Sequence, residues 1–302
     1  MEKSQRQIVG SSVVALLHQG AIALVHFIIY TNLLISTGAV ALTLATLLLF
    51  NIRPIPYVLL WFVFSSTWLV YGLLKYNVFS GSAAQNGHTV WYTHYFWQSN
   101  AVLALALVIV MVSFFQLKKN TMCWAVFPAF LTVAYYGFPT SANSRFSLRQ
   151  LVWIKPLVVA LVWALVTVVL PLTEVDEFPT YWWILFGIRV LYVTGLCVLF
   201  EIKDIPADNA TGLHTIPQLF GIRTTHNLAM LVFGVAFVLA LGLCRFSSSQ
   251  PAFLAIAAIQ LWCMLLCRWF SGKTDEKWYY IALDGTMLLL PVLVACFELW
   301  VG

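Results

Sequence analysis

The chain has 302 residues, of which 62% are hydrophobic and only 9% are charged. Soluble globular domains carry about 25% charged residues, so this composition excludes an ordinary soluble domain and indicates an integral membrane protein. The formal net charge of +5 needs no nucleic-acid partner, because attraction to anionic lipid head groups is its ordinary explanation.

Nine apolar runs follow one another, separated by short polar breaks. Each is close to the ~20 residues with which a helix crosses a hydrocarbon core ~30 Å thick. Lipid offers the backbone no hydrogen-bond partners, so spans of this length must be helices. We therefore expect one all-α domain over residues 1–302, a polytopic bundle of about nine transmembrane helices. Their expected ranges are 22–48, 56–75, 98–116, 121–138, 153–172, 180–201, 226–244, 251–270 and 279–300.

The first of these runs is longer than the others. Residues 11–50 are almost continuously apolar, which is compatible with an interfacial helix that leads into one long, tilted span.

Basic residues predict the orientation, because short loops that carry Lys and Arg stay on the cytoplasmic side. One set of alternate loops has eleven of them, namely Lys3, Arg6, Lys75, Arg145, Arg149, Lys155, Lys203, Arg223, Arg268, Lys273 and Lys277. The other set has four, namely Arg53, Lys118, Lys119 and Arg245, together with the acidic loop TEVDEF at 173–178. We expect a cytoplasmic N-terminus and a C-terminus on the opposite side.

The stretch FEIKDIPADNATGLHTIPQLFG, residues 200–221, places Glu201, Asp204 and Asp208 together at the end of an apolar run. In a helix these offsets fall within about 60° of one face. Like charges this close repel one another unless a cation lies between them, and carboxylate oxygens suit Mg²⁺. Because proline cannot donate a backbone hydrogen bond, we expect the sixth span to end near Lys203 and a short helix to begin near Pro206.

The run EIKDIPADNATGLHTIPQLFG resembles the second acidic motif of the UbiA superfamily of intramembrane prenyltransferases, roughly D-x-x-D-x-x-x-D followed by G-x-x-T. Glu201 stands where the first Asp is usual, Asp204 and Asp208 match the next two, and Gly212 and Thr215 match the tail. The resemblance implies a helical bundle open to lipid, in which Asp-rich motifs hold Mg²⁺ on an isoprenoid diphosphate. Neutralising the departing diphosphate would help prenyl transfer to an acceptor.

The first acidic motif of that superfamily is missing, because no Asp or Glu occurs between Glu2 and Glu174. Basic residues on the same side are then the candidate diphosphate contacts, chiefly Lys155 and Arg149, with Lys203 inside the acidic segment. Two interpretations stay open. The protein is a prenyltransferase that uses fewer metal ions, or it binds isoprenoid lipids without turning them over.

Two charges are expected inside spans, Arg189 in the sixth and Asp284 in the ninth. Ionisable groups at membrane depth are costly and normally face the bundle interior with a partner, so mutual pairing is expected. These charges also support an alternative from another class of protein. In a carrier for lipids or small molecules, Arg189 and Asp284 would be the functional charges.

The orientation generates a first prediction. A cysteine placed at position 210 should be labelled by a membrane-impermeant maleimide only after the cells are opened, because the acidic segment is expected to be cytoplasmic. A cysteine at position 175, in the loop with the acidic residues, is the matched control and should react in intact cells. Labelling of position 210 in intact cells would contradict the orientation.

Overall fold

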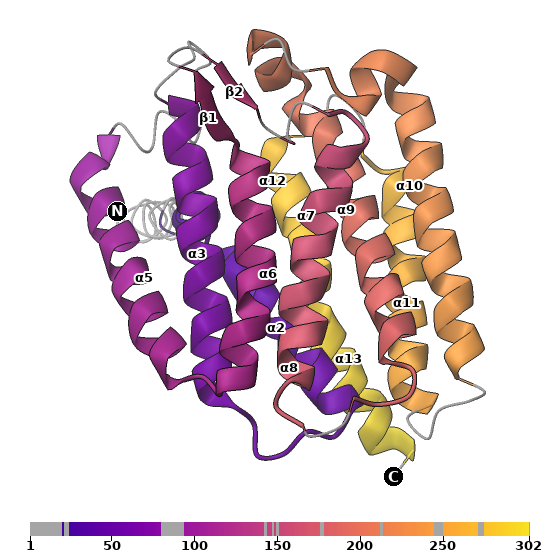
Figure 1. The fold of residues 1–302 in the computed structure, drawn as a ribbon. Helices are drawn as coiled ribbons and strands as arrows, with labels where there is room; N and C mark the ends of the chain where they lie inside the picture. Colours follow the sequence, from indigo (N-terminus) through magenta and orange to yellow (C-terminus); the bar gives the residue numbers. More distant parts are fainter. Residues whose placement is uncertain are drawn as a thin grey trace, which may run out of the picture.

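Helices packed side by side form the bundle shown in Figure 1. The computed structural model describes residues 20, 24–79, 94–141, 144–146, 148, 151–175, 178–211, 214–244, 250–270 and 275–301. In chain order the elements are α2 (Leu33–Leu49), α3 (Tyr57–Phe79), α5 (Phe96–Gln116), α6 (Lys119–Tyr136), β1 (Phe138–Ser141), β2 (Ser144–Phe146), α7 (Ile154–Ala164), the π-helical turn η2 (Leu165–Val169), α8 (Leu170–Leu172), α9 (Trp182–Thr211), α10 (Ile216–Leu243), α11 (Gln250–Cys267), α12 (Glu276–Tyr279), the π-helical turn η3 (Tyr280–Asp284) and α13 (Gly285–Val301).

Seven helical segments are long and apolar enough to cross a membrane. An eighth candidate is a bent pair, the helix Leu24–Tyr30 followed by α2. The expected fourth span corresponds to α6, which begins with Lys119 and Asn120 and is not among the seven. By length and composition the described residues therefore support seven or eight spans rather than nine. The protein is a multi-pass helical membrane protein.

The outer surface of the bundle is apolar, as a lipid-facing surface must be. Large hydrophobic side chains are exposed on most of the long helices, for example Phe115, Leu231, Val238 and Leu265, each at least 62% exposed. Such extensive exposure would promote aggregation in water. It supports placement of the bundle in lipid.

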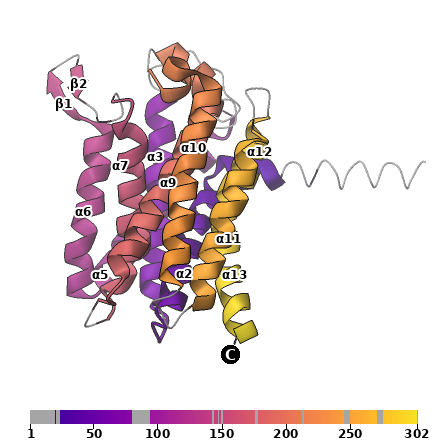
Figure 2. The same cartoon turned by 90° about the vertical axis from the view of Figure 1, so that its right-hand side faces the viewer.

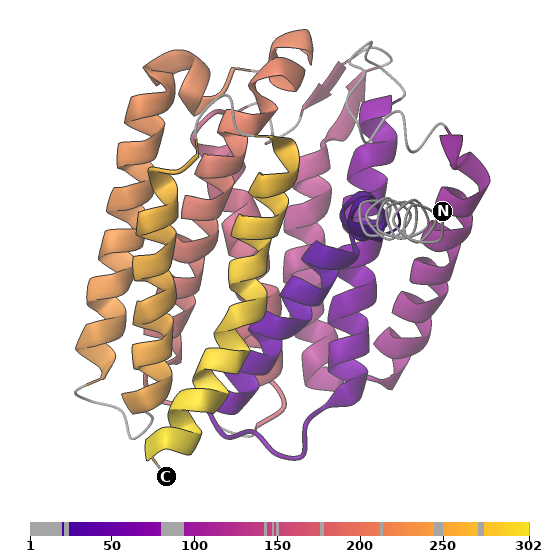
Figure 3. The same ribbon diagram turned by 180° about the vertical axis from the view of Figure 1, so that it is seen from behind.

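Most of the packing joins helices that follow one another in the chain: α3 lies against α5, α9 against α10, and α10 against α11. Contacts between distant parts of the chain are made by the last helix, α13, which packs against α2 as well as α11 (Figure 3), and by α2, which also packs against η2. Figures 1 and 2 show β1, β2, the α9–α10 turn and α12 at one end of the bundle and the C-terminus at the other. We call the first of these the acidic end.

The helix Leu24–Tyr30 is bent by 67° from α2, so the described part of the first apolar run is a broken helix. This form is compatible with an interfacial helix that leads into a span, which the sequence allowed. The fold is also not purely helical, because β1 and β2 pair antiparallel, with Phe138 opposite Phe146. A hairpin this short depends on its surroundings for stability.

The expected break near Pro206 is wrong, because α9 continues through this proline to Thr211. A proline near a helix end removes one backbone hydrogen bond, and tertiary contacts can compensate for that loss. Pro217 lies in the first turn of α10, where proline is favourable. The backbone of α10 then departs from helical geometry at Gly221, where φ is 80°, a value that glycine adopts without steric cost.

The contact between α9 and α10 depends on a glycine. A β-carbon added at Gly195 would lie 2.6 Å from the ring of Phe233, and Phe233 is fully buried. Small residues allow membrane helices to approach closely. Gly195 therefore permits the bulky ring to fill the space between the two helices.

Replacing this glycine should destabilise the bundle. For Gly195→Leu we expect a loss of about 1–3 kcal/mol in unfolding free energy, because extra atoms would overpack a filled site. Gly187→Leu, on the same helix, is the control, since a β-carbon there meets nothing within 4 Å. Thermal unfolding in detergent would compare the two variants. Equal melting temperatures would show that Gly195 has no special packing role.

Candidate functional site

A partly buried lysine connects α7 to the acidic end of α9. The Nζ atom of Lys155 lies 3.4 Å from Asp208 Oδ2 and 3.6 Å from Glu201 Oε1. The three side chains are only 14%, 4% and 3% exposed, respectively. The second Glu201 oxygen accepts a hydrogen bond of 3.1 Å from the backbone N–H of Ile216, the first residue of α10. This cluster, Lys155–Glu201–Asp208, therefore joins three helices.

A second cluster lies on the neighbouring face of α9 and connects it to the last span. Lys203 pairs with Asp204, lies 3.6 Å from Glu276 Oε1, and donates a 3.2 Å hydrogen bond to the Tyr280 hydroxyl. Its ammonium also lies 4.9 Å from the centre of the Tyr280 ring, within the range of a cation–π contact. Asp204 and Glu276 are 40% and 33% exposed. The Lys203–Asp204–Glu276 cluster is thus the more accessible of the two.

The three carboxylates expected at one cation are therefore divided between two lysines. Glu201 and Asp208 are seven residues apart, almost two helical turns, and share a face, whereas Asp204 lies about 60° from Glu201 and about 40° from Asp208 around the helix. Within the described residues, no three His, Cys, Asp or Glu side chains are grouped closely enough to hold a metal ion by themselves. The magnesium site expected at Glu201, Asp204 and Asp208 stays a prediction, and in the structure Lys155 and Lys203 balance the repulsion among these carboxylates.

The residues present nevertheless suit Mg²⁺ in their chemistry. All the acidic groups offer oxygen ligands, and Glu201 Oε1 is buried without a hydrogen bond among the described residues. Mg²⁺ is commonly held by one or two carboxylates together with waters and substrate phosphates. A metal ion arriving with a phosphate ligand would not need all three carboxylates.

The polar turn between α9 and α10 is held by side-chain amides. The backbone N–H of Thr215, which is 1% exposed, donates to Gln218 Oε1 at 2.8 Å, and Gln218 Nε2 donates to Asn209 Oδ1 at 2.9 Å. These bonds fix the start of α10 beside the two clusters. Gly212 and Arg149, both named from the sequence, lie outside the described residues.

The expected pairing of Arg189 with Asp284 is not observed. Both are buried, at 3% and 2% exposed. Arg189 donates long hydrogen bonds to the hydroxyls of Thr167, at 3.4 Å, and Thr46, at 3.5 Å. No ion pair within 4 Å joins Arg189 to Asp284, two residues that the structure fully describes. The guanidinium instead donates to hydroxyl groups of neighbouring elements. Hydrogen bonds of this kind between helices are common in membrane proteins.

Sequence reasoning missed Glu276 and Tyr280 as members of the acidic end. Their signal was present, because the loop before the last span belongs to the same set of alternate loops as Lys203. Loop alternation assigns these residues to one end of the bundle. It does not reveal which of them meet, because that depends on the rotation of each helix about its axis.

The fold and these clusters define a multi-pass helical membrane protein with a charged centre at one end of its bundle. Comparison with known proteins finds no relative, because no family model, no curated protein and no solved structure matches the chain. The function must therefore be argued from the residues.

Removing Lys155 should be costly for folding. Lys155→Met leaves two buried carboxylates without their shared cation, and we expect a loss of about 3 kcal/mol in unfolding free energy, at the lower end of the range for a broken buried pair. Adding Glu201→Gln to this variant should restore part of the loss, since it removes one of the two carboxylates.

The matched control is Lys118→Met. Lys118 lies 3.2 Å from Glu174 but is 61% exposed, and exposed ion pairs contribute only about 0–1 kcal/mol. Denaturation of all three variants in detergent would compare their stabilities. If Lys155→Met were as mild as Lys118→Met, the buried cluster would not stabilise the fold.

Proposed function

We propose that this chain is a UbiA-like membrane protein that binds an isoprenoid diphosphate at its acidic end, together with Mg²⁺. The observation that carries the proposal is Lys155, a nearly buried cation that lies between two carboxylates of the acidic segment. A lysine in this position offers a charged contact to a phosphate group. The neighbouring carboxylates offer oxygen ligands to a metal ion on that phosphate.

The two clusters differ in exposure, and this difference supports different roles for them in binding the metal ion and the phosphate. Asp204 is 40% exposed, so a solvated metal ion can reach it without displacing packed side chains. Glu201 and Asp208 are shielded, and ligand binding there requires Lys155 to change partner from carboxylate to phosphate. When bound, Mg²⁺ would neutralise charge on the diphosphate.

The apolar surroundings suit the rest of such a ligand. Isoprenoid chains partition into lipid, and the helices that carry the two clusters have apolar outer faces. The proposal counts α6, which is not among the seven candidate spans, as a ninth span beside those seven and the bent pair, and it places the acidic end in the cytoplasm. It rests on the eleven-to-four division of basic residues given above and on the motif from Glu201 to Thr215.

Prenyl transfer needs more than this binding site. A single acidic segment supplies half of the metal scaffold that the superfamily uses, and residues 3–173 contain no carboxylate side chain. We therefore propose binding as the primary function and prenyl transfer as a further step, decided by a direct assay. Release of pyrophosphate from farnesyl or geranylgeranyl diphosphate with Mg²⁺ would establish the enzyme.

A second candidate function, a carrier for lipids or small molecules, is favoured by one observation. Arg189 is buried inside the bundle, and one of its two threonine partners, Thr167, lies in the π-helical turn η2. Such turns occur frequently at functional sites of membrane and soluble helices. Intramembrane charges often mark transport pathways. In a carrier, Asp284→Asn would abolish uptake into vesicles while leaving diphosphate binding unaffected.

Substitutions in the acidic segment test the binding proposal. We expect Asp204→Asn and Asp208→Asn each to weaken Mg²⁺-dependent binding of farnesyl diphosphate by roughly ten- to hundredfold, because each removes a charge-assisted interaction of about 1.5–3 kcal/mol. Calorimetry on the protein in lipid nanodiscs, with Mg²⁺ and with EDTA, would measure the affinities.

The control is Glu174→Gln, which neutralises a carboxylate near Lys118, outside the two clusters, and should leave binding unchanged. Thermal unfolding of each variant would separate lost binding from lost folding. If both Asn variants bound farnesyl diphosphate as tightly as the parent, the acidic segment would have no role in binding. If the parent had no affinity and Asp284→Asn lost transport, the carrier would replace this proposal.

A further inference from the structure

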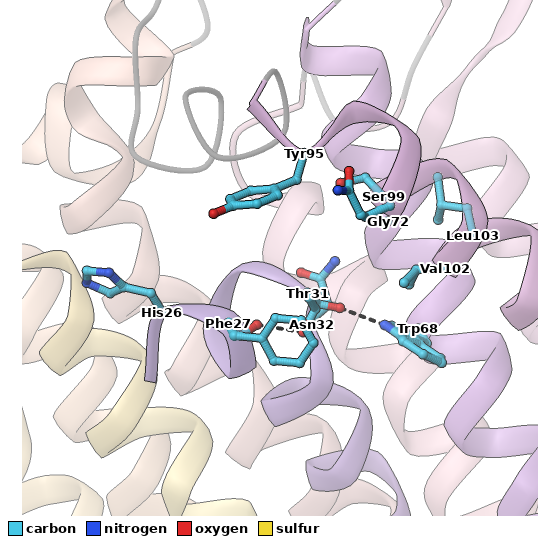
Figure 4. Close-up of a pocket in the computed structure, with 11 residues that line it drawn as sticks. His26, Phe27, Thr31, Asn32, Trp68, Gly72, Tyr95, Ser99, Val102 and Leu103 are labelled. Atoms are coloured by element: carbon cyan, nitrogen blue, oxygen red, sulfur yellow. Dashed lines mark hydrogen bonds between the residues drawn. The ribbon is translucent and has the colours of Figure 1, made fainter. Parts of the chain in front are cut away.

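A pocket lies beside the bend in the first apolar run, apart from the charged clusters. Its volume is about 440 Å³, and it is lined by residues of the bend, of α3 and of α5. Figure 4 shows Thr31 and Asn32 of the bend on one side, Trp68 below, and Ser99, Val102 and Leu103 of α5 on the other. This volume lies within the range of ~300–1,000 Å³ typical of small-molecule sites.

The break in the helix is tolerated beside the pocket because the conformation and the hydrogen bonds of its backbone are accommodated there. Asn32 has a left-handed backbone conformation, with φ of 63°, which asparagine tolerates better than most residues. The carbonyl of Thr31, freed by the bend, accepts a 2.6 Å hydrogen bond from the Trp68 indole. Irregular backbone at membrane depth is tolerated where it is buried in protein or lines a cavity. The bend is thus an ordered part of the pocket lining.

Two polar side chains that line the pocket have an atom without a hydrogen-bond partner among the described residues. Ser99 is 3% exposed, yet its hydroxyl has no partner among the described residues. Ser113, on the same helix, donates instead to the carbonyl of Ile109 at 2.6 Å. The Nε2 atom of His26 is likewise buried without a described partner. Buried polar groups without partners are costly, and a ligand that bonds to them would remove that cost.

The Asn32 side chain adds a third polar group. Asn32 is 4% exposed and stands at the N-cap of α2, but its amide does not cap that helix. Figure 4 shows this amide directed from the bend toward the side of the pocket where Tyr95 and Ser99 lie. Together, Asn32, Ser99 and His26 offer hydrogen-bond donors to an oxygen-bearing ligand.

The chemistry of the lining defines the ligand class. None of the residues that line the pocket is Asp, Glu, Lys or Arg, so the desolvation cost of a diphosphate or another strong anion would not be offset. The rings of Phe27, Trp68 and Tyr95 favour stacking or edge contacts with a planar ring. We propose that this pocket binds an uncharged ring compound with carbonyl or hydroxyl oxygens, either free or as the head group of a lipid.

Duroquinone, a neutral ring with two carbonyl oxygens, is a suitable probe. Durene has the same methylated ring without the oxygens, so it isolates the contribution of hydrogen bonds. Radiolabelled probes would be measured on the full chain in nanodiscs, with empty nanodiscs as the measure of partition into lipid. We expect saturable binding of duroquinone at one site per chain and weaker binding of durene.

Variants of the lining make the test specific. Ser99→Ala and Asn32→Gly should each weaken duroquinone binding by about three- to tenfold, the loss expected for one hydrogen bond, with little effect on durene. Glycine keeps the left-handed conformation accessible at position 32. Ser113→Ala is the matched control and should change neither affinity. Val102→Trp and Leu103→Trp should fill the pocket and abolish binding of both probes.

Further arms separate this site from the proposed diphosphate site and identify the source of the ring. Excess farnesyl diphosphate with Mg²⁺ should not displace duroquinone. A benzoquinone with a ten-carbon chain that binds more tightly, after correction for partition, would identify a lipid head group, and equal binding would identify a free compound. Non-saturable uptake, durene binding equal to duroquinone binding, or unchanged binding in folded Val102→Trp and Leu103→Trp would each overturn the proposal.

Discussion

The structure depends on one constraint, namely that polar groups inside a hydrocarbon layer must find partners within the protein. The backbone meets this constraint by forming helices. Buried hydroxyls meet it by donating to the carbonyl four residues earlier, as Ser36, Thr43 and Thr167 do. The same demand attaches helices to one another, since Trp163 of α7 donates to the hydroxyl of Tyr71 on α3. Charged residues are accordingly few, and those inside the bundle have defined positions.

Because of this constraint, a buried polar group that lacks an ordinary partner is informative about function. The Ser99 hydroxyl is one of a few buried hydroxyls without a partner among the described residues, a group that also includes Thr194, whereas Ser113, in the same helix as Ser99, has an ordinary partner. In the same way, Arg189 is unusual because its described partners are neutral hydroxyls at 3.4 and 3.5 Å. A soluble protein could expose either group to water. A membrane protein has no such option, so groups of this kind indicate ligands, water or a second conformation.

The sequence predicted the helical membrane bundle well, because apolar runs of spanning length have few alternatives. It also placed Lys155 on the same side of the membrane as the acidic segment, where the structure pairs this lysine with Glu201 and Asp208. It failed where the answer depended on helix rotation or local compensation. The angles of about 60° from Asp204 to Glu201 and about 40° to Asp208 were small enough to suggest one site, yet Asp204 pairs with a different lysine. Threonine partners for Arg189 were invisible, because threonines in membrane helices usually bond to their own backbone.

The position of Lys155 has a mechanical consequence for α9. Its two carboxylate partners lie on either side of Pro206, Glu201 before it and Asp208 after it, so one ammonium group splints the turn in which the proline has no backbone hydrogen bond. Helical continuity across that turn thus depends on a charge supplied by another helix. Any anion that attracts Lys155 away would release both ends of the splint together. The rigidity of the final turns of α9 therefore depends on the contacts of a single side chain on α7.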